Sequence, residues 1–266
     1  MVDGDFIPAA PSVLVKTGQF ARDVSVIVGW NADDSSFFTS PTITTDADVA
    51  ASLYQFPALK NSTIARLLDM YPAAEFAGAV LPNDSVTAQY YRASRIQRDL
   101  TVACPAVDIA FHVAKYAQHG ATARLYELNQ TEFSATFAAE GTPYLGVSHF
   151  SDIAYVFEWS ALPGATAADR ALAVAVAGSW AAFAANGDPA RVKAGNGTTL
   201  GEWPVAFGDG ANLKGDAPAE FAVNVIGGPS AGPETVTAHN GTGPLAAEKL
   251  VARCAYLNTL YDELQT

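Results

Sequence analysis

The stretch Gly146–Phe157 reads GVSHFSDIAYVF and decides how the rest of the chain is interpreted. Its pattern places one histidine, His149, in a short loop between a predicted strand and an apolar helix. A histidine in such a loop can present its imidazole to a neighbouring nucleophile while an acid holds the other ring nitrogen. The stretch therefore favours a layered α/β protein with a histidine suited to acid–base chemistry.

Two apolar runs predict strands for this fold, one over Val24–Gly29 and one over Ala123–Leu128. Thr166 and Asp169 resemble a capping box that opens a helix closed by Gly187. Other helices are predicted over 46–56, 61–70, 85–99, 105–118 and 245–264. Strands that alternate with helices indicate an α/β architecture.

The segment 188–243 is rich in Pro, Gly and Asn, and we predict that it forms loops. Two strands alone would make a poor sheet with long open edges. We therefore expect part of the fold to lie outside this chain.

Composition excludes several classes of partner. The 266 residues carry 15 Lys+Arg against 27 Asp+Glu, a net charge of -12. Such a surface repels phosphate backbones and anionic headgroups, so nucleic acid is not an expected partner. No apolar run reaches the roughly 18 residues of a membrane-spanning helix, and Ala171–Ala185 is interpreted as a core helix. Arg92, Arg95 and Arg98 share a helix face that we expect to be solvated.

Processing signals point to the secretory route. Met1–Asp5 lacks the basic and apolar regions of a signal peptide, yet five N-x-Ser/Thr sequons occur, at Asn61, Asn83, Asn129, Asn196 and Asn240. Five glycosylation candidates beside only two cysteines favour a secreted protein. We therefore expect the natural start to lie upstream of Met1.

Four separated segments carry a family resemblance. They are Val2–Pro8 (VDGDFIP), Val28–Ser35 (VGWNADDS), the His149 stretch, and Trp180–Pro189 (WAAFAANGDP) followed by Trp203-Pro204. In this order they resemble the type-B carboxylesterases, the family of secreted fungal lipases and cholinesterases. The resemblance implies a partial α/β-hydrolase fold, with residues 1–266 as its C-terminal portion and few strands flanked by many helices.

Carried over by position, Asp34 would be the acid of a catalytic triad and His149 its general base. The chain departs from the family here, since Asp34-Ser35 stands where Glu-Gly is usual. Alternatives remain open: Asp33 or Asp34 could cap the following turn, Asp33 could be the acid, and His149 could be a buried core histidine. Asp152 matches an acidic family position that supports the triad, or simply begins a helix. His112, His119 and His239 lack such context and are interpreted as structural or surface residues.

The two cysteines, Cys104 and Cys254, lie in contexts that resemble a disulfide pair of the cholinesterase-like members. That bond would close a loop of about 150 residues and contribute roughly 5 kcal/mol in the chain-entropy model. The alternative is two buried free thiols. Neither cysteine has a second Cys or a His at ligand spacing, so no metal is expected, and the resemblance implies no cofactor.

The sequence contains no serine suited to be the nucleophile. Triad order in this fold is Ser, acid, His, so the serine should precede Asp34, and no G-x-S-x-G occurs there. The one match, Gly228–Gly232 around Ser230, follows His149 and lies in a predicted loop, so we reject Ser230. The Gly-rich oxyanion loop is absent too.

The resemblance implies a carboxylesterase or lipase acting on small-molecule or lipid esters. We expect negligible activity of the chain alone and a partner in the missing N-terminal half of the same fold. Two alternatives are a non-catalytic cholinesterase-like binding or adhesion module and an unrelated α/β domain.

Overall fold

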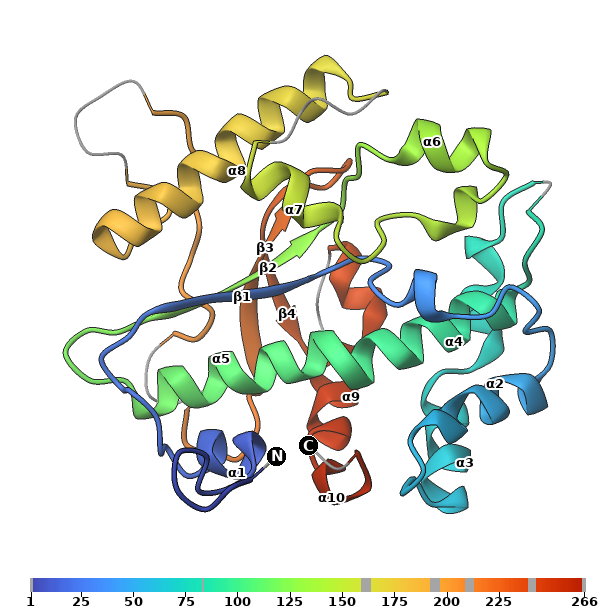
Figure 1. Ribbon diagram of the computed structural model, residues 1–266, viewed down its shortest axis with the longest axis horizontal. Helices are drawn as coiled ribbons and strands as arrows, with labels where there is room; N and C mark the ends of the chain where they lie inside the picture. The colour runs from blue at the N-terminus through green and yellow to red at the C-terminus, as the bar shows by residue number, and fades with distance from the viewer. Residues whose placement is uncertain are drawn as a thin grey trace.

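A computed structural model describes residues 2–82, 84–158, 164–191, 197–208, 213–238 and 243–264. Its centre is one four-stranded sheet with the order β1-β2-β3-β4 (Figure 1). The strands are β1 (Val26–Asn31), β2 (Ala123–Leu128), β3 (Glu220–Ile226) and β4 (Gly232–Thr237). The first three run parallel, and β4 is antiparallel to β3. Strands β1 and β4 therefore form the two edges.

The sheet corrects the prediction of loops over 188–243, because this segment contains β3 and β4. Strand β3 reads EFAVNVI, a nearly continuous apolar run without alternation, as buried parallel strands have. Strand β4 contains Pro233, which an edge strand tolerates. The first predicted strand is shifted by two residues, and β2 has the predicted bounds.

The helices are α1 (Pro11–Lys16), α2 (Asp46–Ser52), α3 (Asn61–Met70), α4 (Ala88–Arg98), α5 (Cys104–Tyr116), α6 (Ser134–Ala139), α7 (Ser151–Val156), α8 (Ala167–Asn186), α9 (Leu250–Leu257) and α10 (Tyr261–Leu264). Short 3-10 helices cover Ser36–Phe38, Leu53–Gln55, Ala73–Ala79, Pro143–Leu145 and Pro244–Glu248. The predicted capping box of Thr166 and Asp169 opens α8, and Gly187 ends it at φ 78°.

A π-helical turn, Asp99–Ala103, makes α4 and α5 one continuous rod where two helices were predicted. Pro105, in the first turn of α5, explains this π-helical segment, because proline lacks an N–H and its ring displaces the carbonyl four residues back. The helix predicted over 245–264 is broken instead. Lys249 adopts φ 54°, a left-handed conformation that separates Pro244–Glu248 from α9.

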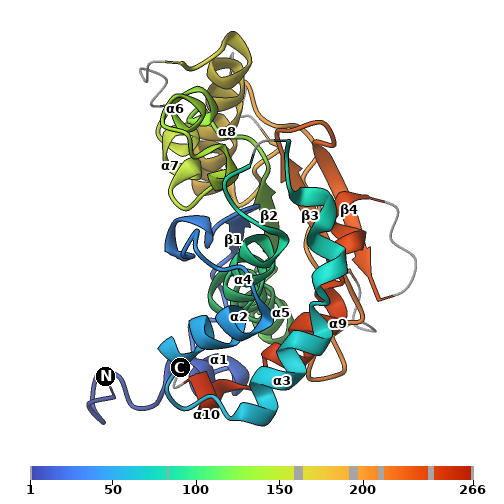
Figure 2. The same ribbon diagram turned by 90° about the vertical axis from the view of Figure 1, so that its right-hand side faces the viewer.

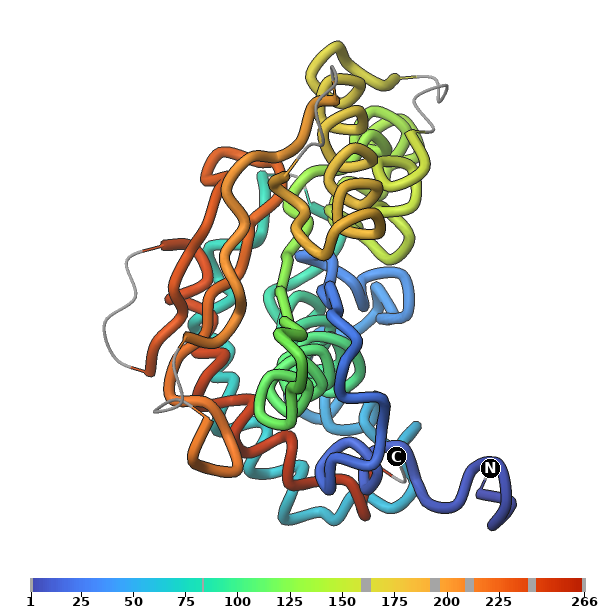
Figure 3. Tube along the Cα trace, turned by 90° about the vertical axis from the view of Figure 1, so that its left-hand side faces the viewer, coloured from blue at the N-terminus to red at the C-terminus, as the bar shows by residue number. Residues whose placement is uncertain are grey.

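The sheet is covered on both faces. Helix α5 packs on β1 and β2, and its core extends to α9 and to Leu125 and Val223 of the sheet. On the other face, Leu128 and Ile226 pack with Tyr155 of α7 and residues of α8. Figure 2 shows α6–α8 grouped apart from α4, α5 and α9. The two chain ends lie at the same end of the molecule (Figure 3).

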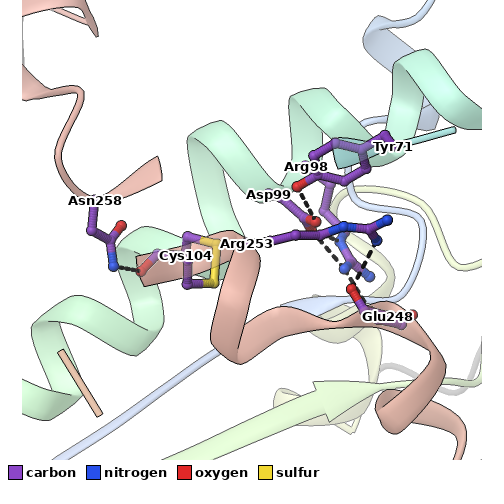
Figure 4. The surroundings of a disulfide bond; sticks show 8 residues. Tyr71, Arg98, Asp99, Cys104, Glu248, Arg253 and Asn258 are labelled. Atoms are coloured by element: carbon purple, nitrogen blue, oxygen red, sulfur yellow. Dashed lines mark hydrogen bonds and ion pairs between the residues drawn. A yellow bond between two sulfur atoms is a disulfide. The ribbon is translucent and has the colours of Figure 1, made fainter. Parts of the chain in front are cut away.

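A disulfide between Cys104 and Cys254 joins the start of α5 to α9 (Figure 4). It is the pair that the resemblance implies, and it bridges 150 positions of sequence. No free cysteine remains in the chain that the structure describes. Within the same ranges, no helix is long and apolar enough to cross a lipid bilayer.

Candidate active site

Asp34 and His149 lie in hydrogen-bonding contact. Asp34 is in the loop that follows β1, and its Oδ1 lies 2.5 Å from Nδ1 of His149. The Asp34 side chain is 4% exposed, whereas the His149 side chain is 36% exposed. The second carboxylate oxygen accepts the backbone N–H of Asn31 at 2.9 Å. A buried, oriented carboxylate thus holds one nitrogen of a solvent-accessible imidazole.

The other ring nitrogen of His149 faces no hydrogen-bonding partner among the residues that the structure describes. With a proton on Nδ1 donated to Asp34, Nε2 is the acceptor. The rings of Phe38 and Phe150 flank the imidazole at centroid distances of 5.4 and 4.2 Å, and both phenyl groups are more than 60% exposed. Phe150 adopts φ 71°, an uncommon conformation for a bulky residue and a mark of functional sites. The imidazole is therefore available to a reacting group beside an apolar surface.

Asp33 does not contact the imidazole and instead joins the two loops. Its backbone N–H donates to the Val147 carbonyl, and its Oδ2 accepts the Val147 N–H, each at 3.0 Å. Burial raises the pKa of the Asp33 carboxyl, opposed by Arg95, the Val147 N–H and Arg98. Of the two adjacent aspartates, only Asp34 is paired with the histidine.

A buried ion cluster lies behind the loop of residues 32–35, which contains Asp34 and is called the acid loop below. The cluster contradicts the prediction that the arginines form a solvated stripe. Arg98 is fully buried, and its Nη2 donates to Asp99 and Glu248 at 2.6 Å each. Its Nη1 donates to the carbonyl of Ala32 at 3.0 Å. Arg95 pairs with Glu248 at 2.5 Å. Helical spacing identified the shared face of these arginines but not their carboxylate partners: Asp99 directly follows Arg98, and Glu248 comes from elsewhere in the chain.

The cluster continues toward the disulfide and the sheet. Figure 4 shows Tyr71, whose hydroxyl donates to Asp99 at 2.7 Å, with the Arg253 guanidinium 3.8 Å from its ring centroid. Toward the sheet, Glu127 accepts the Trp30 indole N–H at 2.6 Å. Burial, and then Glu248, raise the pKa of Glu127 to about 8, although Arg98 opposes the shift. The acid loop thus rests on a charged core.

Within the described ranges, the remaining predicted residues form no hydrogen bond with Asp34 or His149. Asp152 is in the first turn of α7 and accepts the Tyr126 hydroxyl at 3.2 Å. His112 is buried, with Nδ1 2.9 Å from the Asp108 carbonyl oxygen, and His119 is exposed. Ser230 is exposed in the turn between β3 and β4.

Of the glycosylation candidates, Asn61 is exposed at the start of α3 and Asn129 is half-buried. Asn83, Asn196, Asn240 and His239 lie outside the described residues. No group of three or more His, Cys, Asp or Glu that could hold a metal ion occurs within the described ranges.

Sequence reasoning missed the residues that support the pair. Asn31 donates its side-chain N–H to the Ser148 carbonyl at 3.0 Å, and Ser36 donates to the Leu145 carbonyl at 2.7 Å. Asn31 and Asp33 stand inside the Val28–Ser35 motif, which was a usable signal. Their partners are backbone atoms, and no side-chain pattern reveals those.

Comparison with known proteins identifies the family of the chain. The model of the carboxylesterase family matches residues 1–213. An inactive carboxylesterase-like protein, VdtD, of Byssochlamys spectabilis is 33% identical, covering 97% of this chain and 43% of the relative. A secreted lipase of Arthroderma benhamiae is 32% identical with the same coverage. The crystal structure of Aspergillus niger EstA shares the fold, with a TM-score of 0.69 at 18% identity over 99% of this chain and 45% of that one. The chain spans less than half the length of these proteins, and it belongs to the carboxylesterase family.

Proposed function

We propose that this chain supplies the general base and the acid of a carboxylic ester hydrolase that works through a Ser-His-Asp acyl-enzyme mechanism. The observation that carries the proposal is the 2.5 Å contact between His149 Nδ1 and Asp34 Oδ1. Membership of the carboxylesterase family supplies the reaction class. Nothing in the proposal needs a metal or cofactor.

Each group then has one role in the reaction. His149 Nε2 accepts the proton of a serine hydroxyl as its oxygen attacks the ester carbonyl carbon. The imidazolium returns that proton to the departing alcohol, which leaves the acyl group on the serine. Water is activated by the same nitrogen, releases the carboxylic acid and regenerates the serine. Asp34 fixes the imidazole tautomer and stabilises its cation throughout.

We propose that residues 1–266 form the C-terminal portion of a hydrolase domain. The serine would then come from polypeptide of the same domain outside these residues. The chain spans 43% of two relatives, which leaves room for the nucleophile and the oxyanion loop elsewhere. Strand β1 is an edge of the sheet and carries the acid loop at its end. A parallel strand added along β1 would bring its own C-terminal end next to Asp34. Ser230, exposed on a hairpin turn, is not our nucleophile.

We also propose that the protein acts outside the cell on small-molecule or lipid esters. The Cys104–Cys254 disulfide fits an oxidising compartment, and a secreted lipase is among the relatives. Asn61 is accessible to glycosylation. The exposed Phe38 and Phe150 beside His149 favour esters with an apolar group.

A chimera tests the function directly. The part of the Arthroderma benhamiae lipase that this chain does not match is fused to residues 1–266, and hydrolysis of p-nitrophenyl butyrate is measured. We expect turnover from the chimera and none from the isolated chain. Asp34→Asn should lower kcat by about 10⁴-fold, as the loss of the orienting acid does in serine proteases. His149→Gln should lower kcat at least as much, while Ser230→Ala should leave it unchanged.

Three outcomes oppose the proposal. Turnover that survives His149→Gln would remove the histidine from the mechanism, and turnover of the isolated chain that Ser230→Ala abolishes would relocate the nucleophile. A folded but inactive chimera would favour the second candidate, a non-catalytic cholinesterase-like binding module. The name of VdtD, an inactive carboxylesterase-like protein, supports that candidate. The intact Asp34–His149 pair favours the enzyme, because a binding module has no chemical need for it.

A further inference from the structure

We infer that Asp33 is a positioning residue that sets the distance between Asp34 and His149, with Gly146 as its required partner. The inference rests on the proposed function, since it assigns a role beside a pair whose catalytic part is itself proposed. It goes further by giving a task to the aspartate that precedes the triad acid.

The first observation is a reciprocal clamp. Asp33 and Val147 exchange two hydrogen bonds of 3.0 Å, one from the Asp33 N–H to the Val147 carbonyl and one from the Val147 N–H to the Asp33 carboxylate. Asp33 directly precedes the acid, and Val147 lies two residues before the histidine. The clamp therefore fixes the separation of the two loops close to the reacting groups.

The second observation concerns the space around the carboxylate. A Cβ on Gly146 would lie 2.2 Å from Asp33 Oδ2 and 2.9 Å from its Cγ, far inside any allowed contact. Gly146 also adopts φ 55° and ψ -137°, a combination that residues with a side chain rarely adopt. The backbone at Gly146 thus lies against Asp33 in a manner that only glycine permits.

The third observation is that the acid loop is fixed on its other side. The Ala32 carbonyl accepts from Arg98, and the Ala32 N–H donates to the Leu128 carbonyl at 2.9 Å. With residue 32 held by α4 and β2, the position of the histidine loop depends on what bridges the two loops. Asn31 and Ser36 each add one bond to that loop, but only Asp33 contributes two.

The test measures the hydrogen bond between His149 and Asp34 rather than ester hydrolysis. The 266-residue chain is labelled with ¹⁵N, and the Nδ1–H proton of His149 is followed by NMR. A short hydrogen bond to a carboxylate moves such a proton far downfield. His149→Gln assigns the resonance by removing it. We expect Asp33→Ala and Gly146→Ala to abolish or broaden it, and Asp33→Asn to retain it, because an amide oxygen still accepts the Val147 N–H.

Three further variants keep the test falsifiable. Asp33→Glu preserves the charge but moves the carboxylate by one methylene, so we expect it to shift the resonance if position is what matters. Asp108→Asn is the control, since Asp108 is a buried aspartate that accepts from Tyr261 and not from either loop. In Asp33→Ala/Gly146→Ala the two closest atoms to the new Cβ, at 2.2 and 2.9 Å, are gone and the residue 33 Cβ lies at 3.4 Å, so this variant should be folded at least as stably as Gly146→Ala alone.

A wild-type resonance in folded Asp33→Ala or in folded Asp33→Glu would overturn the inference. Equal loss in Asp108→Asn would do the same, because the effect would then not be specific to the clamp. The readout does not depend on hydrolysis, so an inactive chimera would defeat the proposed function and leave this result standing.

Discussion

Replacing Arg98 with methionine removes the centre of the charged core beneath the acid loop. Its guanidinium donates to Asp99, Glu248 and the Ala32 carbonyl, and the side chain is 1% exposed. Burial by itself would lower the pKa of Arg98, but Asp99, Glu248 and Glu127 hold it well above its usual value. Arg98 is thus a permanent cation, and methionine replaces it with similar bulk but no donor.

The expected loss follows from the groups left behind. Removing one partner of a buried ion pair costs about 3–5 kcal/mol, because the remaining charge has no compensation. The Ala32 carbonyl also loses a donor, which costs about 1–3 kcal/mol where the carbonyl is buried. These contributions overlap, so we expect Arg98→Met to lower the free energy of unfolding by at least about 3 kcal/mol. That is a large part of the roughly 5–15 kcal/mol that stabilises a typical domain.

Urea unfolding followed by tryptophan fluorescence measures this loss, since Trp30 is buried and bonded to Glu127. Arg92→Met is the matched control on the same helix. The Arg92 side chain is 3% exposed, but that of its carboxylate partner, Asp46, is 67% exposed and can be hydrated. We expect the control to cost only about 1–3 kcal/mol, from two orphaned backbone carbonyls.

Adding Asp99→Asn to Arg98→Met should restore part of the stability, because it removes one uncompensated carboxylate. An Arg98→Met loss no larger than that of Arg92→Met would refute the reasoning. So would a double variant less stable than the single one, since the loss would then not arise from uncompensated charge.

Three other predictions concern the framework of the site. Gly29→Ala should cost about 1–3 kcal/mol in urea, because its Cβ would lie 2.4 Å from the Tyr126 carbonyl oxygen; an unchanged midpoint would contradict this. Cys254→Ser should lower the free energy of unfolding by about 2–5 kcal/mol, and the reduced wild-type protein should have the same urea midpoint as this variant. Equal midpoints for the oxidised and reduced wild-type protein would argue against a stabilising disulfide. Glu127 has a pKa raised to about 8 from 4.5, so its contribution to stability is fully present below about pH 4.5 and is lost as pH rises through about 8. Glu127→Gln should flatten this fall in urea midpoints measured from about pH 5 to about pH 9, and an unchanged slope would show that another group titrates.

Local signals predicted local structure. The α3 and β2 bounds match the sequence prediction, and the Thr166–Asp169 capping box lies where its spacing placed it. Each of these depends on residues within a few positions of one another. Helix α4 shows the limit of this reasoning, because it begins at Ala88, capped by Thr87, rather than at residue 85.

Long-range structure was not predictable from the same signals. Strand β3 gains its stability from pairing with β2, about 100 residues earlier in the chain, and its own composition offers no alternation. The arginines of α4 have the spacing of a solvated face, but partners such as Asp46 and Glu248 come from outside the helix. A sequence pattern shows which residues share a face and not what covers that face.

The candidate site also contains features that sequence motifs predict and features that depend on long-range contacts. The motifs singled out Asp34 and His149, and the structure brings these two side chains together. The clamp between Asp33 and Val147 escaped prediction because three of its four hydrogen-bonding groups belong to the backbone. Side-chain identity can mark an acid or a base, but the distance between them is set by backbone contacts.

The disulfide and the buried ion pairs form one continuous chain of contacts that ends at the loop carrying Asp34. The disulfide holds α9 against the start of α5, and Glu248 lies just before α9. Glu248 in turn binds Arg98, which holds the Ala32 carbonyl two residues before Asp34. The segment around Glu248 and α9 therefore reaches the acid loop through one ion pair and one hydrogen bond rather than through the sheet. This arrangement explains why a buried charge cluster lies where apolar packing would be as stable: only a fork of donors can join a helix, a carboxylate and a loop carbonyl at one point.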